Sequence, residues 1–398
     1  MHTLEDLDSG ALAGARHVRL THLGLRAFPH QLLTLADTLE TLDLSGNQLQ
    51  TLPRELAHLT RLRILFASNN PFRTLPHVLG QCLQLEMVGF KACHIQHVPH
   101  DSLPPQLRWL ILTDNQLTTL PASLGTRLRL QKLMLACNQL QHLPDLHHCP
   151  QLELVRIASN RFDHIPPTLL RSPRLAWAAL AGNPMTQKSE LLALNASAPT
   201  AISYQNLEVG ALLGEGTSGH VYRATRTDTG DAIALKVFKA AHTSDGTPQS
   251  ELAAGMAAGP HPHLLAALAR VDGHPHGQLA MALPLLPAGY VTLAAPPSLA
   301  TCTRDVYAPH TRLGRAQAQQ LLACVRSALV HLHAQGVLHG DLYAHNILWQ
   351  PDTGDAMLSD LGAATLTHGL PADQVAQLQA MEWRAFAHLE SEVLARCG

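Results

Sequence analysis

The chain has 398 residues, with 28 Lys plus Arg against 30 Asp plus Glu, so it lacks the charge imbalance typical of proteins that bind nucleic acid or anionic membranes. Hydrophobic residues make up 46% of the chain, enough to bury the cores of two domains, which excludes a disordered protein. The 26 His and seven Cys are scattered without the spacings typical of metal sites, so we expect none built from them.

The N-terminal sequence MHTLEDLDSG lacks the basic and then apolar pattern of a signal peptide. The uncharged run 279–300 is long enough to span a bilayer as a helix. Its prolines would interrupt such a helix: Pro284, Pro287, Pro296 and Pro297. We therefore expect a cytoplasmic protein without a membrane span, with reduced cysteines, in which this run is a buried strand and a connector.

The first half of the chain is repetitive. Units aligned on LETLDLSGNQLQTLP follow one another at 22 to 24 residues and begin at Ala15, Leu39, Leu62, Leu85, Leu107, Leu130, Leu152 and Leu175. One such unit cannot bury its own apolar face, whereas a stack of them forms a continuous core. The frame LxxLxLxxNxLxxLP resembles leucine-rich repeats, which implies an α/β solenoid with one short strand per repeat over residues 1–188.

Most repeats carry an asparagine at the same place, where its amide can bind otherwise unpaired backbone along the stack. These residues are Asn47, Asn70, Asn115, Asn138, Asn160 and Asn183, and the series is interrupted at Leu23 and Cys93. A coiled or globular helical segment is a poor alternative, because the leucines recur at intervals of two and three inside the longer period.

Alternation along each LxxLxL strand sends the leucines inward and the intervening residues to the concave face. From the third repeat onward, these outward positions are mostly apolar, although strand positions that face solvent have no structural need for such side chains. We predict that they bind a protein partner or the chain's own second half: Ile64, Phe66, Met87, Trp109, Ile111, Met134, Leu154 and Trp177. The alternative is that a generally apolar chain places such residues there without function.

The repeats stop after Asn183. Residues 189–203 contain a short helical run and then the small-residue sequence NASAPTA, so we predict a linker there and a second domain over 204–398.

Three glycines form a GxGxxG sequence at Gly214, Gly216 and Gly219. Such a sequence lets backbone amides approach phosphate, but it also occurs in dinucleotide-binding turns that lead into a helix. Here residues 220–238 alternate between apolar and polar around Thr229-Gly230, which predicts two strands. Lys236 then follows Gly219 by 17 residues, at the place of the VAIK lysine of protein kinases.

Two later motifs extend this resemblance. LHGDLYAHNIL contains His339, Asp341 and Asn346, and LSDLG contains Asp360. In order and spacing they resemble the catalytic loop and the metal-binding DFG motif of protein kinases. The resemblance implies a bilobal α+β kinase-like domain that uses ATP and Mg²⁺. Helical periodicity over 316–335 fits the helix before the catalytic loop.

The resemblance also implies roles for single residues. Lys236 would hold the α and β phosphates, oriented by Glu251, while Asn346 and Asp360 would bind Mg²⁺ and Asp341 would accept the proton of the substrate hydroxyl. ATP would contact Leu213, Gly214, Gly216, Gly219, Val221, Ala234, Lys236, Leu283 and Leu285. As structural alternatives, Asp341 would be a turn residue and Asp360 the cap of a strand end.

The sequence departs from the kinase pattern in three places. Gly340 replaces the arginine of the HRD motif, so activation by loop phosphorylation is not expected. Tyr343 stands where Ser/Thr kinases carry a lysine near the γ-phosphate. No APE motif follows Asp360, and 382–396 looks like the large helix after the activation segment, so we expect a truncated C-lobe similar to that of compact bacterial repeat kinases.

These observations predict an ATP-dependent protein kinase that phosphorylates Ser or Thr, with the repeats recruiting a substrate or partner. Two alternatives stay open. One is a pseudokinase scaffold that binds proteins, and the other is a kinase for a small molecule.

Overall fold

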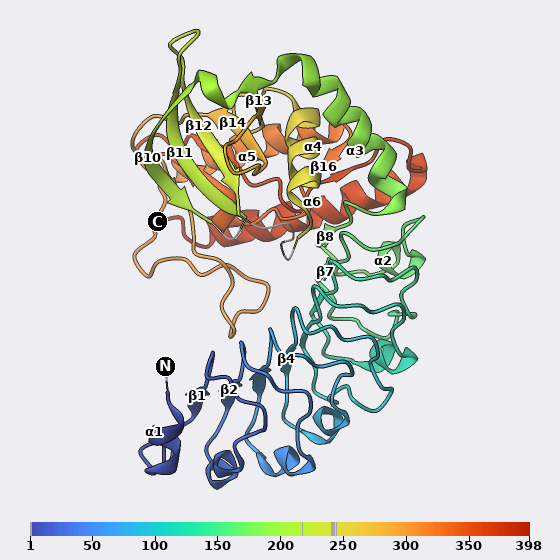
Figure 1. Cartoon of the computed structure of the whole chain (residues 1–398). Coiled ribbons are helices and arrows are strands. Elements are labelled where there is room, and N and C mark those ends of the chain that lie inside the picture. The colour runs from blue at the N-terminus through green and yellow to red at the C-terminus, as the bar shows by residue number, and fades with distance from the viewer. Residues whose placement is uncertain (1, 217, 240–242, 244) are drawn as a thin grey trace. The chain divides into compact units, whose positions relative to one another are not determined.

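The computed structural model describes residues 2–216, 218–239, 243 and 245–398 (Figure 1). The chain divides into two compact units, Met1–Leu175 and Ala176–Gly398. The first contains seven of the predicted repeat strands, and the second contains the eighth together with the kinase-like domain.

The repeat unit is built on one parallel sheet, with one strand from each repeat. The strands are β1 (His17–Arg19), β2 (Thr41–Asp43), β3 (Ile64–Phe66), β4 (Met87–Gly89), β5 (Trp109–Ile111), β6 (Lys132–Met134) and β7 (Leu154–Arg156). Neighbouring strands pair in register, so that equivalent repeat positions such as Ile64 and Met87 face each other. The opposite side carries short helices: α1 (Leu4–Asp8), η1 (His30–Leu35), η2 (Arg54–His58), η3 (His77–Gln81), η4 (Ala122–Thr126) and α2 (Pro167–Leu170).

The asparagine ladder forms as the sequence predicts. The Asn138 amide donates to the carbonyls of Leu112 at 2.9 Å and Leu135 at 3.0 Å, and its Oδ1 accepts from the Leu117 amide at 3.0 Å. Each bond of this kind adds about 1 kcal/mol of net stability and prevents a buried backbone group from being left unpaired. At the interrupted position of the ladder, the Cys93 thiol donates to the Ala67 carbonyl at 3.3 Å.

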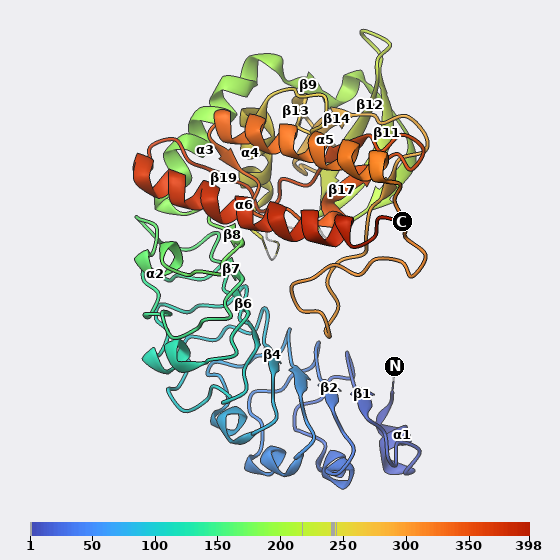
Figure 2. The same ribbon diagram turned by 180° about the vertical axis from the view of Figure 1, so that it is seen from behind.

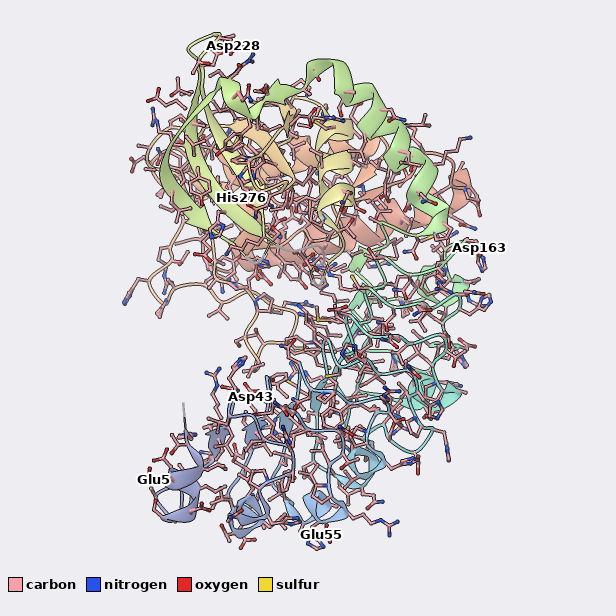
Figure 3. All side chains as sticks on the ribbon, in the orientation of Figure 1. Glu5, Asp43, Glu55, Asp163, Asp228 and His276 are labelled. Carbon is pink, nitrogen blue, oxygen red and sulfur yellow. The ribbon has the colours of Figure 1, made fainter. Side chains whose placement is uncertain are left out.

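The N-terminal lobe of the second unit is a six-stranded sheet with one helix against it (Figure 1). In spatial order its strands are β10 (Leu207–Glu215), β11 (Gly219–Arg226), β12 (Ala232–Phe238), β14 (Ala280–Pro284), β13 (Ala269–Asp272) and β9 (Ile202–Ser203), with η6 (Tyr204–Asn206) before β10 and helix α4 (Pro248–Ala258) after β12. The predicted Thr229-Gly230 turn joins β11 to β12, and Asp228 lies at its tip (Figure 3).

The C-terminal lobe rests on two long helices, α5 (Arg315–Ala334) and α6 (Ala372–Leu394), which run side by side in Figure 2 and are in contact. Helix α5 matches the predicted range, and its buried residues follow the helical period: Ala318, Leu321, Leu322, Cys324, Val325, Ala328, Leu329 and Leu332. Helix α6 begins ten residues before the range 382–396 predicted for it. Short strands complete the lobe: β15 (Val291–Thr292), β16 (Val337–Leu338), β17 (Ile347–Trp349), β18 (Ala356–Leu358) and β19 (Thr365–Leu366), with η7 (Ala344–Asn346) before β17.

The predicted linker over 189–203 is ordered structure instead. Helix α3 (Pro184–Ser197) occupies most of it, followed by η5 (Ala198–Thr200) and β9. Glu190 on α3 accepts a hydrogen bond from the Ser250 hydroxyl of α4 at 2.9 Å, and Leu194 packs against the apolar cluster of Phe238 and Leu252. A segment that buries polar and apolar side chains in this way is part of the second unit and does not act as a flexible spacer.

Among the described residues, no helix combines the length and apolar character that crossing a membrane requires. The apolar run 279–300 forms β14, β15 and connecting loop, as its prolines predict.

Candidate active site

A buried ion pair joins strand β12 to helix α4. Lys236 Nζ donates to Glu251 Oε1, and the two residues are 8% and 3% exposed. Thr247 caps α4 by accepting from the Ser250 amide at 3.2 Å, which fixes the first turn of the helix from which Glu251 projects. The sequence therefore identified this lysine and its carboxylate partner correctly as a contacting pair.

The charges around this pair shift its ionisation. Burial alone would lower the pKa of Lys236, but the Glu251 and Asp360 carboxylates outweigh burial and raise it. Burial is the largest influence on Glu251 and raises its pKa to about 7, against the opposing effect of Lys236. Lys236 is therefore a cation at neutral pH, as binding of phosphate oxygens requires.

One face of the sheet gathers the residues predicted to contact ATP. Val221 pairs with Lys236, and Ala234 pairs with Leu283, so alternation puts all four side chains on one face. Gly216 donates to the Gly219 carbonyl at 2.9 Å across the end of the β10–β11 hairpin. The remaining predicted residues lie around this face: Leu213 and Gly214 are exposed on β10, and Leu285 follows β14.

The catalytic loop is tied together by its own side chains. Asn346 Nδ2 donates to the Asp341 carbonyl at 2.8 Å and to Asp341 Oδ2 at 2.9 Å. The Ser359 amide donates to the Asn346 carbonyl at 2.9 Å, and His339 Nε2 lies 2.9 Å from the Ser359 carbonyl. The segment that ends in Asp360 is thereby fixed beside the segment that carries Asp341.

Asp360 adopts a left-handed backbone conformation, with φ +61°, and its Oδ1 accepts from the Gly362 amide at 3.0 Å. A Cβ placed on Gly362 would lie 3.5 Å from Glu251 Oε2, so this turn lies directly against the buried ion pair. The neighbouring Leu361 is buried. The structure thus brings together all five residues that the sequence predicts for catalysis: Lys236, Glu251, Asp341, Asn346 and Asp360.

Sequence reasoning missed the residues that hold the catalytic loop from behind. The Gly340 amide donates to Glu382 Oε1 at 2.6 Å, and His333 Nε2 lies 2.7 Å from Glu382 Oε2. Glu382 is only 4% exposed on α6. Glu382 is the first residue of the helix expected over 382–396, but its partners lie 42 and 49 residues away in the chain. No short sequence pattern therefore connects them.

A second missed group surrounds His345, the residue before Asn346. Its Nδ1 lies 2.8 Å from Asp305 Oδ1, its amide donates to Asp305 Oδ2 at 3.0 Å, and its Nε2 lies 3.9 Å from Asp341 Oδ2. Burial opposes protonation, but the carboxylates of Asp305 and Asp341 raise the pKa of His345.

Trp177, which was predicted to lie on a docking surface, is 1% exposed. Its Nε1 donates to the Leu342 carbonyl at 2.9 Å, and its ring stacks on Tyr343 with centroids 4.3 Å apart and planes 7° apart. An external partner therefore cannot reach this ring in the described structure, because the catalytic loop covers it.

The other predicted docking residues differ in exposure. Ile64, Phe66, Trp109 and Ile111 are partly exposed, whereas Met87, Met134 and Leu154 are 2%, 9% and 2% exposed. A Cβ placed on Gly89 would lie 2.5 Å from Phe66 and 3.7 Å from Ile111, so both side chains reach the space above the glycine. Lys132 lies 4.2 Å from the centre of the Trp109 ring.

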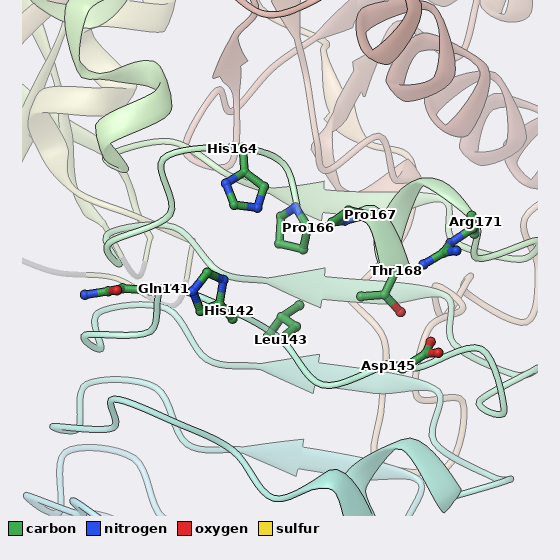
Figure 4. A pocket seen from close by; sticks show the side chains of 9 residues that line it. All are labelled: Gln141, His142, Leu143, Asp145, His164, Pro166, Pro167, Thr168 and Arg171. Atoms are coloured by element: carbon green, nitrogen blue, oxygen red, sulfur yellow. The ribbon is translucent and has the colours of Figure 1, made fainter.

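The repeat unit also has a pocket of about 190 Å³ (Figure 4). It is lined by Gln141, His142, Leu143, Asp145, His164, Pro166, Pro167, Thr168 and Arg171. The two histidine rings lie together at one end of the pocket, with Asp145 and Arg171 at the other (Figure 4). The pocket contains none of the motif residues of the second unit.

Comparison with known proteins agrees with this geometry. Residues 207–386 match the family model of the protein kinase domain, and residues 13–72 and 105–183 match that of the leucine rich repeat. The two models match the two halves of the chain in the order that the sequence motifs predict.

Two curated relatives are protein kinases by name. CBL-interacting protein kinase 22 of Oryza sativa subsp. japonica is 32% identical over 193 residues, covering 46% of this chain and 41% of the rice protein. The DNA damage-responsive serine/threonine-protein kinase RqkA of Deinococcus radiodurans is 31% identical over 166 residues, covering 40% of this chain and 22% of that protein. The chain thus spans less than half of the length of these relatives.

Among solved structures, a leucine-rich-repeat protein of Leptospira interrogans is similar, with a TM-score of 0.38 and 27% identity, over 46% of this chain and 52% of that chain.

Proposed function

We propose that the chain is an ATP-dependent protein kinase that transfers the γ-phosphate to Ser or Thr residues of proteins. The observation that carries the proposal is the buried Lys236–Glu251 pair with Asp360 beside it. Burying the charges of a lysine and a glutamate costs desolvation free energy, so stability alone does not explain the pair. A role in binding phosphate does explain it.

The residues fit ATP and Mg²⁺. Asp360 offers carboxylate oxygens, and Asn346 offers its amide oxygen because its nitrogen is committed to Asp341. Hard oxygen ligands of this kind are those that Mg²⁺ prefers. When bound, the ion would neutralise charge on the phosphates, while Lys236 binds phosphate oxygens and Asp341 orients the acceptor hydroxyl and takes its proton.

The chain's departures from the kinase pattern support a second candidate. Only residues 361–371 separate Asp360 from α6, so little chain is available there to hold a peptide. A small-molecule acceptor would suit this arrangement. A pseudokinase scaffold is the third reading, and the intact set of Lys236, Asp341, Asn346 and Asp360 argues against it.

For the repeats, we propose recruitment of a protein substrate or partner on the partly exposed apolar residues of β3 and β5, where Phe66 and Ile111 both reach the space above Gly89. Contact with the chain's own kinase domain is proposed for Trp177 alone. We propose the cytoplasm as the place of action, because it supplies ATP and Mg²⁺.

The test is phosphate transfer from γ-labelled ATP with Mg²⁺ to the chain itself and to a mixture of proteins and metabolites. Lys236→Met and Asp341→Asn should each lower the rate by about 100-fold or more, because they remove a phosphate ligand and the proton acceptor. Lys188→Met and Asp352→Asn remove the same charges from exposed positions and should leave the rate unchanged.

The position of the label decides among the candidates. Phosphate on Ser or Thr supports the proposal, and phosphate on a metabolite alone supports the small-molecule kinase. Nucleotide binding without any transfer would refute the proposed activity and favour the scaffold.

A further inference from the structure

The eighth repeat lies against the catalytic loop within the second unit. Its strand β8 (Trp177–Ala179) sends the Trp177 indole to the Leu342 carbonyl, 2.9 Å away. Next to this strand, the Leu180 amide donates to Thr365 Oγ1 at 3.2 Å. One repeat therefore binds a chain segment next to each of the two aspartates: the loop that contains Asp341 and the strand β19, which follows Asp360.

The close approach of this repeat explains why the chain has glycine in place of the usual arginine. Gly340 has φ +74°, a conformation that residues with a Cβ rarely adopt. A Cβ there would lie 2.5 Å from the Ala363 carbonyl oxygen and 2.7 Å from the Ala178 carbonyl oxygen. The backbone of the repeat thus occupies the space that a larger residue at position 340 would need.

Stacked rings connect the repeat to the catalytic aspartate. Trp177 stacks on Tyr343 at 4.3 Å, and Tyr343 stacks on His345 at 5.1 Å with the planes 29° apart. His345 is held by Asp305 and lies 3.9 Å from Asp341 Oδ2. A displacement of the Trp177 ring would therefore be passed through packed groups to the Asp341 carboxylate.

The indole is itself held firmly from the other side. It stacks on His388 of α6 at 5.4 Å, and the Arg304 guanidinium lies 5.2 Å from its ring. Rings that are buried on several sides have one position, which is the property that a support for a catalytic group requires.

We propose that the eighth leucine-rich repeat positions the catalytic loop, with Trp177 as a positioning residue for Asp341. The proposal rests on the kinase activity proposed above and deepens it. The segment 361–371 is too short to support the catalytic loop by itself, and the repeat supplies that support. With the loop held in this way, phosphorylation is not needed to order the site.

The kinetic test compares Trp177→Ala with Trp177→Phe in the full chain. We expect Trp177→Ala to lower kcat by about 10- to 100-fold with KM for ATP changed less than about twofold, because misplacement of Asp341 affects the chemical step. Trp177→Phe keeps a stacking ring but not the bond to Leu342, and it should restore most of kcat.

The control is Phe72→Ala, which removes a fully buried ring that packs edge-on against Phe90 in the repeat unit, which does not contain the catalytic loop. It should change kcat less than about twofold where the protein is folded. An unchanged kcat in Trp177→Ala, or an equal loss in both alanine variants, would overturn the positioning role.

Hydrogen exchange tests the same inference without needing activity. In Trp177→Ala, the amides of 339–346 should exchange about 10-fold faster than in the wild type, while those of α5 stay protected. If the wild type transfers no phosphate but this increase is found, the proposed activity fails and the positioning role stands. Unchanged exchange in 339–346 would refute the positioning role itself.

Discussion

The repeat unit and the kinase unit satisfy their buried polar groups in different ways. In the repeats, one residue type at one place in most periods binds backbone groups of its own and the preceding turn, as Asn138 does with Leu112 and Leu135. In the kinase unit, side chains from distant segments bind one another, as Lys236 binds Glu251 and His333 binds Glu382.

This difference separates stability from function. A ladder asparagine does the same work in each repeat, so its loss should cost stability without touching the chemistry. The polar groups of the kinase unit also fix the place of Asp341 and Asp360, so their loss should affect both. Four predictions test this contrast, in order of decreasing expected effect.

The largest effect is expected at Gly340. Gly340→Ala would meet two carbonyl oxygens and would force a Cβ into φ +74°, which should destabilise the protein by about 3 kcal/mol and lower phosphate transfer. Gly273→Ala is the matched control, since Gly273 has φ +79° but open space around it, and it should cost about 1 kcal/mol. Urea unfolding of both variants measures the difference. Equal costs would show that the approach of Ala178 does not constrain position 340.

The next effect is expected at Glu382. Glu382→Gln keeps the shape but replaces one acceptor by a donor that faces either the Gly340 amide or His333, which should cost about 2 kcal/mol. Glu390→Gln, an exposed change on the same helix, should cost less than about 0.5 kcal/mol. Denaturant unfolding together with kcat checks this prediction, and a full kcat in Glu382→Gln would contradict the anchoring of the loop by α6.

A smaller effect is expected in the ladder. Asn138→Ala leaves the buried Leu117 amide without its acceptor, for a cost of about 1.5 kcal/mol, while the carbonyls of Leu112 and Leu135 keep the amides of Asn115 and Asn160. The neighbouring Gln139→Ala should be nearly neutral. Binding of MgATP by the full chain should stay unchanged in both. A loss of nucleotide affinity in Asn138→Ala would contradict the claim that ladder asparagines affect stability alone.

The smallest effect concerns pH. Burial, followed by the Asp305 carboxylate, raises the pKa of Glu392 to about 6, while Tyr307, Arg304 and Arg396 act in the opposite direction. Since the folded pKa lies above the unfolded one, the protonated form is favoured in the fold, and its stabilisation is lost as pH rises through about 6.

Because Glu392 is partly exposed, we expect a modest effect of about 1 kcal/mol. Glu392→Gln should therefore be more stable than the wild type by that amount at pH 8, with the advantage gone at pH 4. Thermal unfolding at the two values measures it, and an advantage that is equal at both would contradict the shift.

Sequence periodicity predicted the repeat strands well, because each repeat is a local unit whose leucine spacing dictates which residues face the core. The kinase motifs also predicted which five side chains meet, although Lys236 and Asp360 lie far apart in the chain. In both cases the information is carried by a short pattern of fixed spacing.

The sequence did not predict the residues whose role depends on tertiary packing. The sequence predicts a linker over 189–203, but Glu190 and Leu194 in its helical run contact α4 and the cluster beside it. Trp177 is predicted to bind a protein partner or the chain's own second half, and the strand pattern does not tell which; in the structure its ring stacks on Tyr343. Alternation along a strand gives the direction of a side chain but does not tell what lies in front of it.

The most direct test of the account is a single-turnover measurement of γ-phosphate transfer by the intact chain with Mg²⁺, compared with Lys236→Met at matched nucleotide occupancy. We predict that the wild type labels Ser or Thr on protein and that Lys236→Met does so at least about 100-fold more slowly. Equal transfer by both, or no transfer by a wild type that binds ATP, would contradict the claim that the buried pair serves phosphoryl transfer.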